Sequence, residues 1–102
     1  MEVCIFAGIC GFQTKVKAET NGEYQTKLQF DTDCPNVKKM AEALDTVNVM
    51  DELFRKGQSQ VMAAAQQHLP HITCPVPVGA LKAMEASAGM ALVKDATITF
   101  TK

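Results

Sequence analysis

The chain has 102 residues, of which 47% are hydrophobic and 21% are charged. These proportions exclude an intrinsically disordered chain, which would have low hydrophobicity and high charge. The length leaves room for one domain spanning residues 1–102. The formal net charge is −1, and lysine and arginine are scattered without a basic stripe, so nucleic acid is not an expected partner.

The first ten residues indicate where the chain works. They include an early acid, Glu2, and lack the basic segment that opens a secretory signal, and their apolar run is too short to span a bilayer. We therefore expect a cytoplasmic protein without a membrane anchor. In a reducing cytosol, its four cysteines should be free, catalytic or metal-bound rather than paired in disulfides.

Three strands are predicted first. Residues 3–9 are apolar at nearly every position, which indicates a central strand that is buried on both faces or lies against a partner chain. Residues 14–19 and 26–30 alternate between apolar and polar side chains. Between them, Asn21-Gly22 is a strong hairpin signal, because both residues tolerate a positive φ. The three strands should form a meander with one wet face.

Three helical patterns follow the strands. The first helix begins at Pro35, with Asp33 or Cys34 as its N-cap, because proline suits the first helical position. A short helix is predicted over residues 49–56, and another spans about residues 59–68. The residues expected to face the core are Val37, Met40, Ala41 and Leu44 in the first of these helices and Val61, Met62, Ala65 and Leu69 in the third.

The last helix is predicted over residues 75–88, with Val78, Leu81, Met84 and Ala88 facing the core. Residues 95–101 alternate between threonine and larger apolar side chains, which predicts a closing strand. Three strands, a run of helices and a closing strand indicate an α+β domain: a four-stranded mixed or antiparallel sheet with helices packed on one face. Its exposed sheet face and short chain favour a homodimer.

Three of the four cysteines lie at the ends of predicted elements. Because hairpin-linked strands are antiparallel, Cys10 and Cys34 should share one end of the sheet, and Cys74 joins them if the last helix starts there. Thiolates select soft or borderline metals, so these cysteines predict a site for zinc or an iron–sulfur cluster. His71, in a His-x-x-Cys spacing with Cys74, is the conditional fourth ligand; His68 is a weaker candidate.

Two other interpretations stay open. In the first, the protein is a sulfur carrier or sulfurtransferase with Cys74 as its nucleophile. Cys74 stands at a predicted helix N-terminus, where free N–H groups favour a thiolate. In the second, the cysteines are core residues, as Cys4 is expected to be, and the protein is an interaction domain that dimerises through its sheet face. No residue set has the spacing of a general acid–base enzyme, so we expect binding or carriage rather than catalysis.

The segment Cys74-Pro75-Val76-Pro77, followed by Leu81-Lys82-Ala83-Met84, resembles the helix opening of TusA-type sulfur-carrier proteins. In that family the cysteine carries a persulfide between enzymes, so the resemblance implies this role for Cys74 and a redox or sulfur-transfer protein partner. The chain also resembles a family of small uncharacterised proteins from anaerobic microbes, through Cys10-Gly11-Phe12, Asp33-Cys34-Pro35 and the segment from Cys74 to Glu85. That resemblance implies an anaerobic setting and oxygen-sensitive sulfur or iron–sulfur chemistry.

Overall fold

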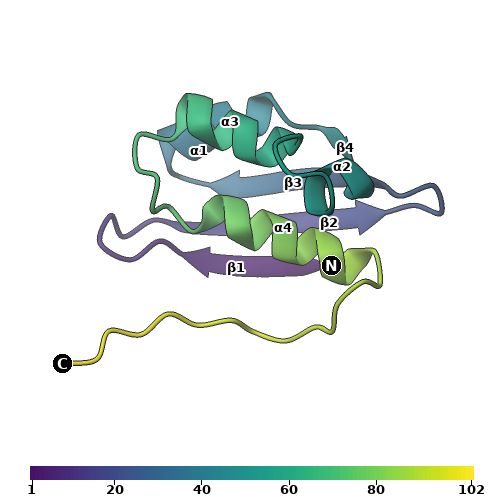
Figure 1. Ribbon diagram of the computed structural model, residues 1–102. Helices are drawn as coiled ribbons and strands as arrows, with labels where there is room; N and C mark the ends of the chain where they lie inside the picture. Colours follow the sequence, from purple (N-terminus) through teal and green to yellow (C-terminus); the bar gives the residue numbers. More distant parts are fainter.

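The computed structural model describes residues 1–102 and contains one antiparallel sheet of order β1-β2-β3-β4 (Figure 1). Alternation builds this sheet: Val16, Ala18 and Leu28 are buried on one face, while the lysines between them are exposed on the other. The strands are β1 (Glu2–Phe6), β2 (Gln13–Thr20), β3 (Gln25–Thr32) and β4 (Thr46–Asn48).

Four helices cover one face of the sheet, and the core lies between the two layers. In Figure 1, α4 lies along β1 and β2, α1 packs on β3, and α3 contacts both α1 and α4. None of the helices combines the length and the apolar character needed to cross a bilayer. The helices are α1 (Pro35–Glu42), α2 (Val49–Leu53), α3 (Gln60–His68) and α4 (Val76–Ser87).

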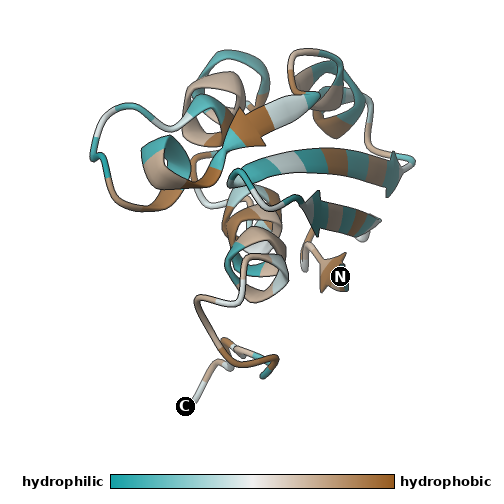
Figure 2. Ribbon diagram, turned by 90° about the vertical axis from the view of Figure 1, so that its right-hand side faces the viewer, coloured by the Kyte–Doolittle hydropathy of each residue, from teal (hydrophilic) through white to brown (hydrophobic).

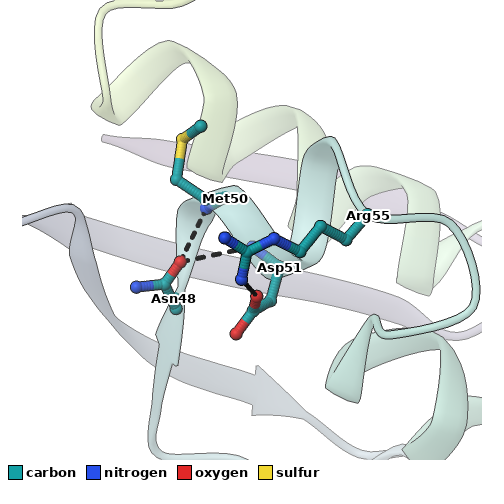
Figure 3. Close-up of polar contacts among 4 residues, drawn as sticks. All are labelled: Asn48, Met50, Asp51 and Arg55. Carbon is teal, nitrogen blue, oxygen red and sulfur yellow. Dashed lines mark hydrogen bonds and ion pairs between the residues drawn. The ribbon is translucent and has the colours of Figure 1, made fainter.

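Side chains cap the short helices. The Oδ1 atom of Asn48 accepts hydrogen bonds from the N–H groups of Met50 at 2.9 Å and Asp51 at 3.2 Å, at the start of α2 (Figure 3). One turn later, Arg55 pairs with the Asp51 carboxylate. Caps of this kind satisfy N–H groups that have no partner inside the helix, which matters most in a helix as short as α2.

Glu52 ties α2 to α3. Its carboxylate is buried, and its Oε1 atom accepts a hydrogen bond from the N–H of Val61 at 3.0 Å, in the first turn of α3. Ser59, the N-cap of α3, accepts from Met62 at 3.1 Å. A buried charge needs such partners, and the partial positive charge of a helix N-terminus suits a carboxylate.

Two contacts fix α4 on the sheet. Gly79 lies against Ile5 of β1 so closely that Ile5 fills the space a side chain at residue 79 would take. At the other end, the Oγ of Ser87 accepts a hydrogen bond from the N–H of Thr20, the last residue of β2, at 2.9 Å. Because β1 and β2 are antiparallel, α4 therefore starts at the end of the sheet where β1 finishes.

The α+β class and the antiparallel sheet with helices on one face confirm the prediction from sequence, but the fourth strand is a different segment. It is β4 at Thr46–Asn48, paired with β3, so the element order is βββαβααα. Three residues are too few to show a strand period in sequence. The predicted closing strand, residues 95–101, is extended but pairs with nothing.

The prediction that the first strand is central is wrong, because β1 is an edge strand bonded only to β2. Val3 and Ile5 are half-buried under α4, whereas Cys4 and Phe6 are exposed. The apolar run of residues 3–9 exceeds what this edge position buries within one chain.

The hairpin between β2 and β3 lies where Asn21-Gly22 predicts it, but its conformation differs. The Oδ1 atom of Asn21 accepts from the N–H groups of Glu23 at 2.8 Å and Gln25 at 3.0 Å, and Tyr24 is the residue with a positive φ, at 61°. The asparagine thus acts through its side chain, as in an Asx turn, rather than by adopting a left-handed backbone.

Two helical residues expected in the core are exposed. Met62 is 46% exposed and Val78 is 54% exposed, while Ala64 in α3 and Ala80 in α4 are buried. Each helix is rotated so that alanines face the neighbouring elements, which lets the backbones approach closely. The spacing of apolar residues in the sequence predicts that the larger side chains, Met62 and Val78, face the core. In the structure the smaller alanines face the core instead.

The segment after α4 stands apart from this body. Gly89, with a φ of 74°, ends the helix as predicted, and the last backbone hydrogen bond joins the N–H of Met90 to the carbonyl of Glu85. Every residue from 89 to 102 is exposed. In both ribbon views this segment runs clear of the sheet and the other helices, and Figure 2 shows apolar residues on it. We call residues 90–102 the tail.

Candidate functional site

Three cysteines lie at the end of the sheet where β1 and β3 finish, which we call the cysteine end. Cys10 is in the loop between β1 and β2, Cys34 connects β3 to α1, and Cys74 precedes α4 (Figure 1). Strand parity predicts the shared position of the first two, and the direction of α4 adds the third. All of the chain's thiols are free.

Cys34 is the N-cap of α1, with Pro35 after it at the first helical position. Its N–H donates to the Oγ1 of Thr32 at 3.1 Å, and its carbonyl accepts from the N–H of Lys38 at 3.0 Å. The side chain makes no capping hydrogen bond and packs, half-buried, against the core. The backbone therefore holds the helix start, and the sulfur is not part of the cap.

Cys74 occupies a similar position one residue earlier relative to its helix. Its N–H donates to the carbonyl of His71 at 3.2 Å, which makes a tight turn. Pro75 is the N-cap of α4, and its carbonyl accepts from the N–H of Gly79 at 3.0 Å. The sulfur is half-buried against the core, so a rigid backbone on both sides positions it at the helix entrance.

Cys10 and His71 differ from these two residues because they are exposed in loops. Gly8 and Gly11 flank Cys10 with φ values of 89° and 76°, and the N–H of Gly11 donates to the carbonyl of Gly8 at 2.9 Å. Only glycine takes this conformation freely, so the turn is specified by sequence. Its effect is to place the Cys10 side chain in solvent.

The structure does not gather the predicted ligands into a metal site. No three side chains of histidine, cysteine, aspartate or glutamate lie close enough together to hold a metal ion. Cys10, Cys34, Cys74 and His71 therefore share a region without forming a coordination shell, which for zinc needs ligand distances of roughly 2.0 to 2.3 Å. Cys10 and His71 belong to the loops at residues 8–11 and 69–75, outside the helices and strands.

Cys4, expected in the core, lies instead on the exposed face of β1. Its sulfur accepts a hydrogen bond from the Nε2 of Gln13 on β2 at 2.7 Å. The sequence carries a signal for this: Cys4 has the opposite parity to Val3 and Ile5, which face α4. It lies on the sheet face opposite the helices and provides an internal reference for thiol reactivity.

Two hollows on the surface are lined by residues other than cysteine. The first is lined by residues at the opposite end of the sheet: Glu19, Thr20, Asn21, Gln25, Lys27 and Thr46. The second is lined by residues of α2, α3 and the loop between them: Glu52, Leu53, Arg55, Lys56, Gly57, Ser59, Met62, Ala63 and Gln66.

Comparison with known proteins identifies a family and no individual relative. No curated protein and no solved structure matches the chain. The model of a family of unknown function, DUF6951, matches residues 1–100. Because this match spans almost the whole sequence, the chain belongs to the DUF6951 family.

Proposed function

We propose that this protein is a small cytoplasmic sulfur carrier that works through Cys74, with Cys34 and Cys10 beside it at the cysteine end. The observation that supports the proposal is the position of Cys74 immediately before the N-cap of α4, half-buried and held by the turn at His71. This placement gives the thiol a defined position at the start of a helix and leaves part of it accessible to a partner.

The chemistry is an exchange of one sulfur atom. The Cys74 thiolate attacks the outer sulfur of a donor's persulfide, a new S–S bond forms at Cys74, and the donor's S–S bond breaks. The donor leaves as a thiolate, while the outer sulfur keeps its proton. Delivery to an acceptor thiolate is the same step in reverse, so no external oxidant or reductant is needed.

The exchange takes place between proteins, because both donor and acceptor thiols belong to other proteins. Persulfide carriage requires one thiol rather than a ligand cluster, and the arrangement of Cys10, Cys34 and Cys74 meets that requirement as it stands. The resemblance of the Cys74 segment to TusA-type carriers and the expected anaerobic setting favour the same chemistry. In this proposal the protein is not itself an enzyme.

Metal binding is the second candidate, and the observation in its favour is that three free thiols share one end of the sheet. Zinc or an iron–sulfur cluster held by Cys10, Cys34, Cys74 and His71 would draw the two exposed loops together. Metal binding would then be coupled to ordering of those loops. It would stabilise the folded protein by the free energy of metal binding minus the free-energy cost of ordering the loops.

Persulfide loading tests the first candidate. Anaerobically purified protein is treated with a small persulfide donor and analysed by mass spectrometry, which should locate one added sulfur on Cys74. The Cys74→Ser variant should lose the added sulfur, and the matched control Cys4→Ser should keep it. Loading that persists in Cys74→Ser would refute the role of this residue.

Alkylation rates provide a second test with a built-in contrast. Exposure alone predicts that Cys4 and Cys10 react first, because they are exposed while Cys34 and Cys74 are half-buried. The proposal expects Cys74 to react first near neutral pH despite its lower exposure. A rate order that follows exposure would count against it.

Metal and acid-labile sulfide analysis of anaerobically purified protein separates the second candidate from the first. Stoichiometric iron with sulfide, or zinc, that is lost from Cys10→Ser, Cys34→Ser and Cys74→Ser alike would establish the thiolate site. Metal content that stays unchanged in all three variants would eliminate it. Failure of both candidates would leave an interaction domain in which Cys34 and Cys74 only pack against the core.

A further inference from the structure

Strand β1 has a free hydrogen-bonding edge. Met1 and Ala18 exchange both backbone hydrogen bonds, at 2.9 and 2.7 Å, so in an antiparallel ladder the odd-numbered residues of β1 bond to β2. The N–H and C=O groups of Glu2, Cys4 and Phe6 therefore point away from β2, where no strand lies.

This edge has few of the features that normally protect one. Proteins block exposed edges with charged side chains, above all lysine, with proline, with bulges or with a covering loop; β1 contains no lysine and no proline, and its one charged residue is Glu2. Its sequence, Glu2–Phe6 followed by Ala7-Gly8-Ile9, is instead the most continuously apolar stretch of the sheet. An unprotected apolar edge is typical of a strand that is covered in the working assembly.

The tail has the matching properties. Residues 95–101 form no helix or strand and run as a drawn-out segment in Figure 1, and their sequence alternates threonines with Ala96, Ile98 and Phe100. Ile98 is 92% exposed and Phe100 is 97% exposed, and no backbone hydrogen bond involves a residue after Met90. An alternating strand with one apolar face gains its stability only by pairing and by burying that face.

We propose that residues 95–101 of one copy pair with the free edge of β1 in a second copy, and that the reverse pairing closes a two-fold dimer. Ala96, Ile98 and Phe100 then continue the helix-side face of the sheet, beside Val3 and Ile5. The threonines continue the opposite, polar face. This assignment is independent of the chemistry proposed for the cysteine end.

The surface next to the free edge accommodates such a strand. Gly79 of α4 lies on Ile5, and helical spacing puts Lys82 and Ala86 on the same side of α4. Because Ile5 already fills the space at Gly79, the room for larger side chains from the incoming strand lies at the small Ala86 and along the aliphatic stem of Lys82. Ile98 and Phe100 are the large apolar residues that the tail offers there.

A second copy of this chain can pair with the free N–H and C=O groups of β1 and also cover the apolar side chains of the tail. The tail runs clear of its own β1 in both ribbon views (Figures 1 and 2). Each tail offers five large exposed apolar side chains, and the pairing segment contributes two of them, Ile98 and Phe100. The other three, which precede the segment, are Met90, Leu92 and Val93.

Sedimentation equilibrium on the full chain tests the assembly. We expect a dimer at micromolar concentration, and Phe100→Lys should weaken it about a hundredfold by removing a central aromatic anchor. The matched control is Thr99→Lys, which adds the same charge on the other face of the tail and should leave the dimer intact. A monomeric parent chain, or equal effects of the two variants, would overturn the proposal.

The backbone edge is tested separately. Cys4→Pro removes an N–H that the β1–β2 ladder does not use, so the chain should still fold, as circular dichroism can verify, but should be monomeric. Cys4→Ala keeps the N–H and should remain dimeric. Should Cys4→Pro fail to fold, Ile98→Lys tests the same pairing from the tail. Dimers that persist in a folded Cys4→Pro or in Ile98→Lys would refute it.

Cross-linking distinguishes a tail that pairs with β1 of another copy from a tail that pairs with β1 of its own chain. Copies with normal and heavy nitrogen are unfolded together, refolded as a mixture, and linked with a carbodiimide between Glu2 and the tail lysines, Lys94 and Lys102. Mixed-isotope links support exchange between copies, and the lysine that reacts reports the strand direction. Links confined to one isotope would show that each tail pairs with its own β1, against the proposal.

Discussion

Replacing Gly79 by alanine tests how closely α4 sits on the sheet. A Cβ atom at residue 79 would lie 2.6 Å from Cγ1 of Ile5 and closer still to its Cδ1, whereas carbon atoms normally pack at about 3.5 to 4.0 Å. Isoleucine is stiff at χ1, so its side chain has little freedom to withdraw. Either Ile5 leaves its rotamer or α4 shifts away from β1.

Two effects of opposite sign set the magnitude. Alanine is favoured over glycine inside a helix by about 1 kcal/mol, whereas overpacking costs about 1 to 3 kcal/mol. Gly79→Ala should therefore lower the free energy of unfolding by about 1 kcal/mol. In an Ile5→Ala background the overlap is gone, and the same substitution should raise it by about 1 kcal/mol.

Urea denaturation of the four proteins in this cycle, at one protein concentration, measures the coupling directly. We expect a coupling energy of about 2 kcal/mol between Gly79 and Ile5. Stabilisation by Gly79→Ala in both backgrounds would show that α4 does not rest on β1 at this point. The reasoning about the position of α4 would then fail.

Three further substitutions test the polar contacts by the same denaturation assay. Glu52→Ala leaves the N–H of Val61 without its acceptor and should cost about 2 kcal/mol; a cost within error of zero would show that this buried contact does not form. Ser87→Ala removes the acceptor for the N–H of Thr20 and should lower the free energy of unfolding by about 1 kcal/mol. An unchanged free energy of unfolding would show that the end of α4 is not held to β2 by this hydrogen bond. Asn48→Ala should cost about 1 kcal/mol, with Asn48→Asp largely retaining the cap.

The sequence predicts the meander and the cysteine end because both depend on short-range rules. Alternation in β2 and β3 fixes which residues face the helices, and antiparallel parity then places Cys10 and Cys34 at one end. The Pro35 and Pro75 signals locate the helix starts to within one residue. These inferences need no knowledge of which strands are neighbours beyond the hairpins.

Position within the sheet is a different matter, because it depends on tertiary contacts. An apolar run such as residues 3–9 reads as a buried strand, although β1 lies at an edge. The three residues of β4 show no period at all. The separation of the thiols at the cysteine end likewise depends on loop conformations that spacing in sequence does not determine.

Helix α4 is synthesised after the strands that it covers, and this order affects folding during synthesis of the chain. The Thr20–Ser87 hydrogen bond joins residues 67 positions apart, and the contact of Gly79 with Ile5 spans a similar distance. Contacts so distant form slowly, and a growing chain has completed the hairpins long before it has made α4. Until then the apolar side of β1 and β2 has no cover, so ribosome-bound intermediates are the species of this protein most exposed to aggregation and to capture by chaperones.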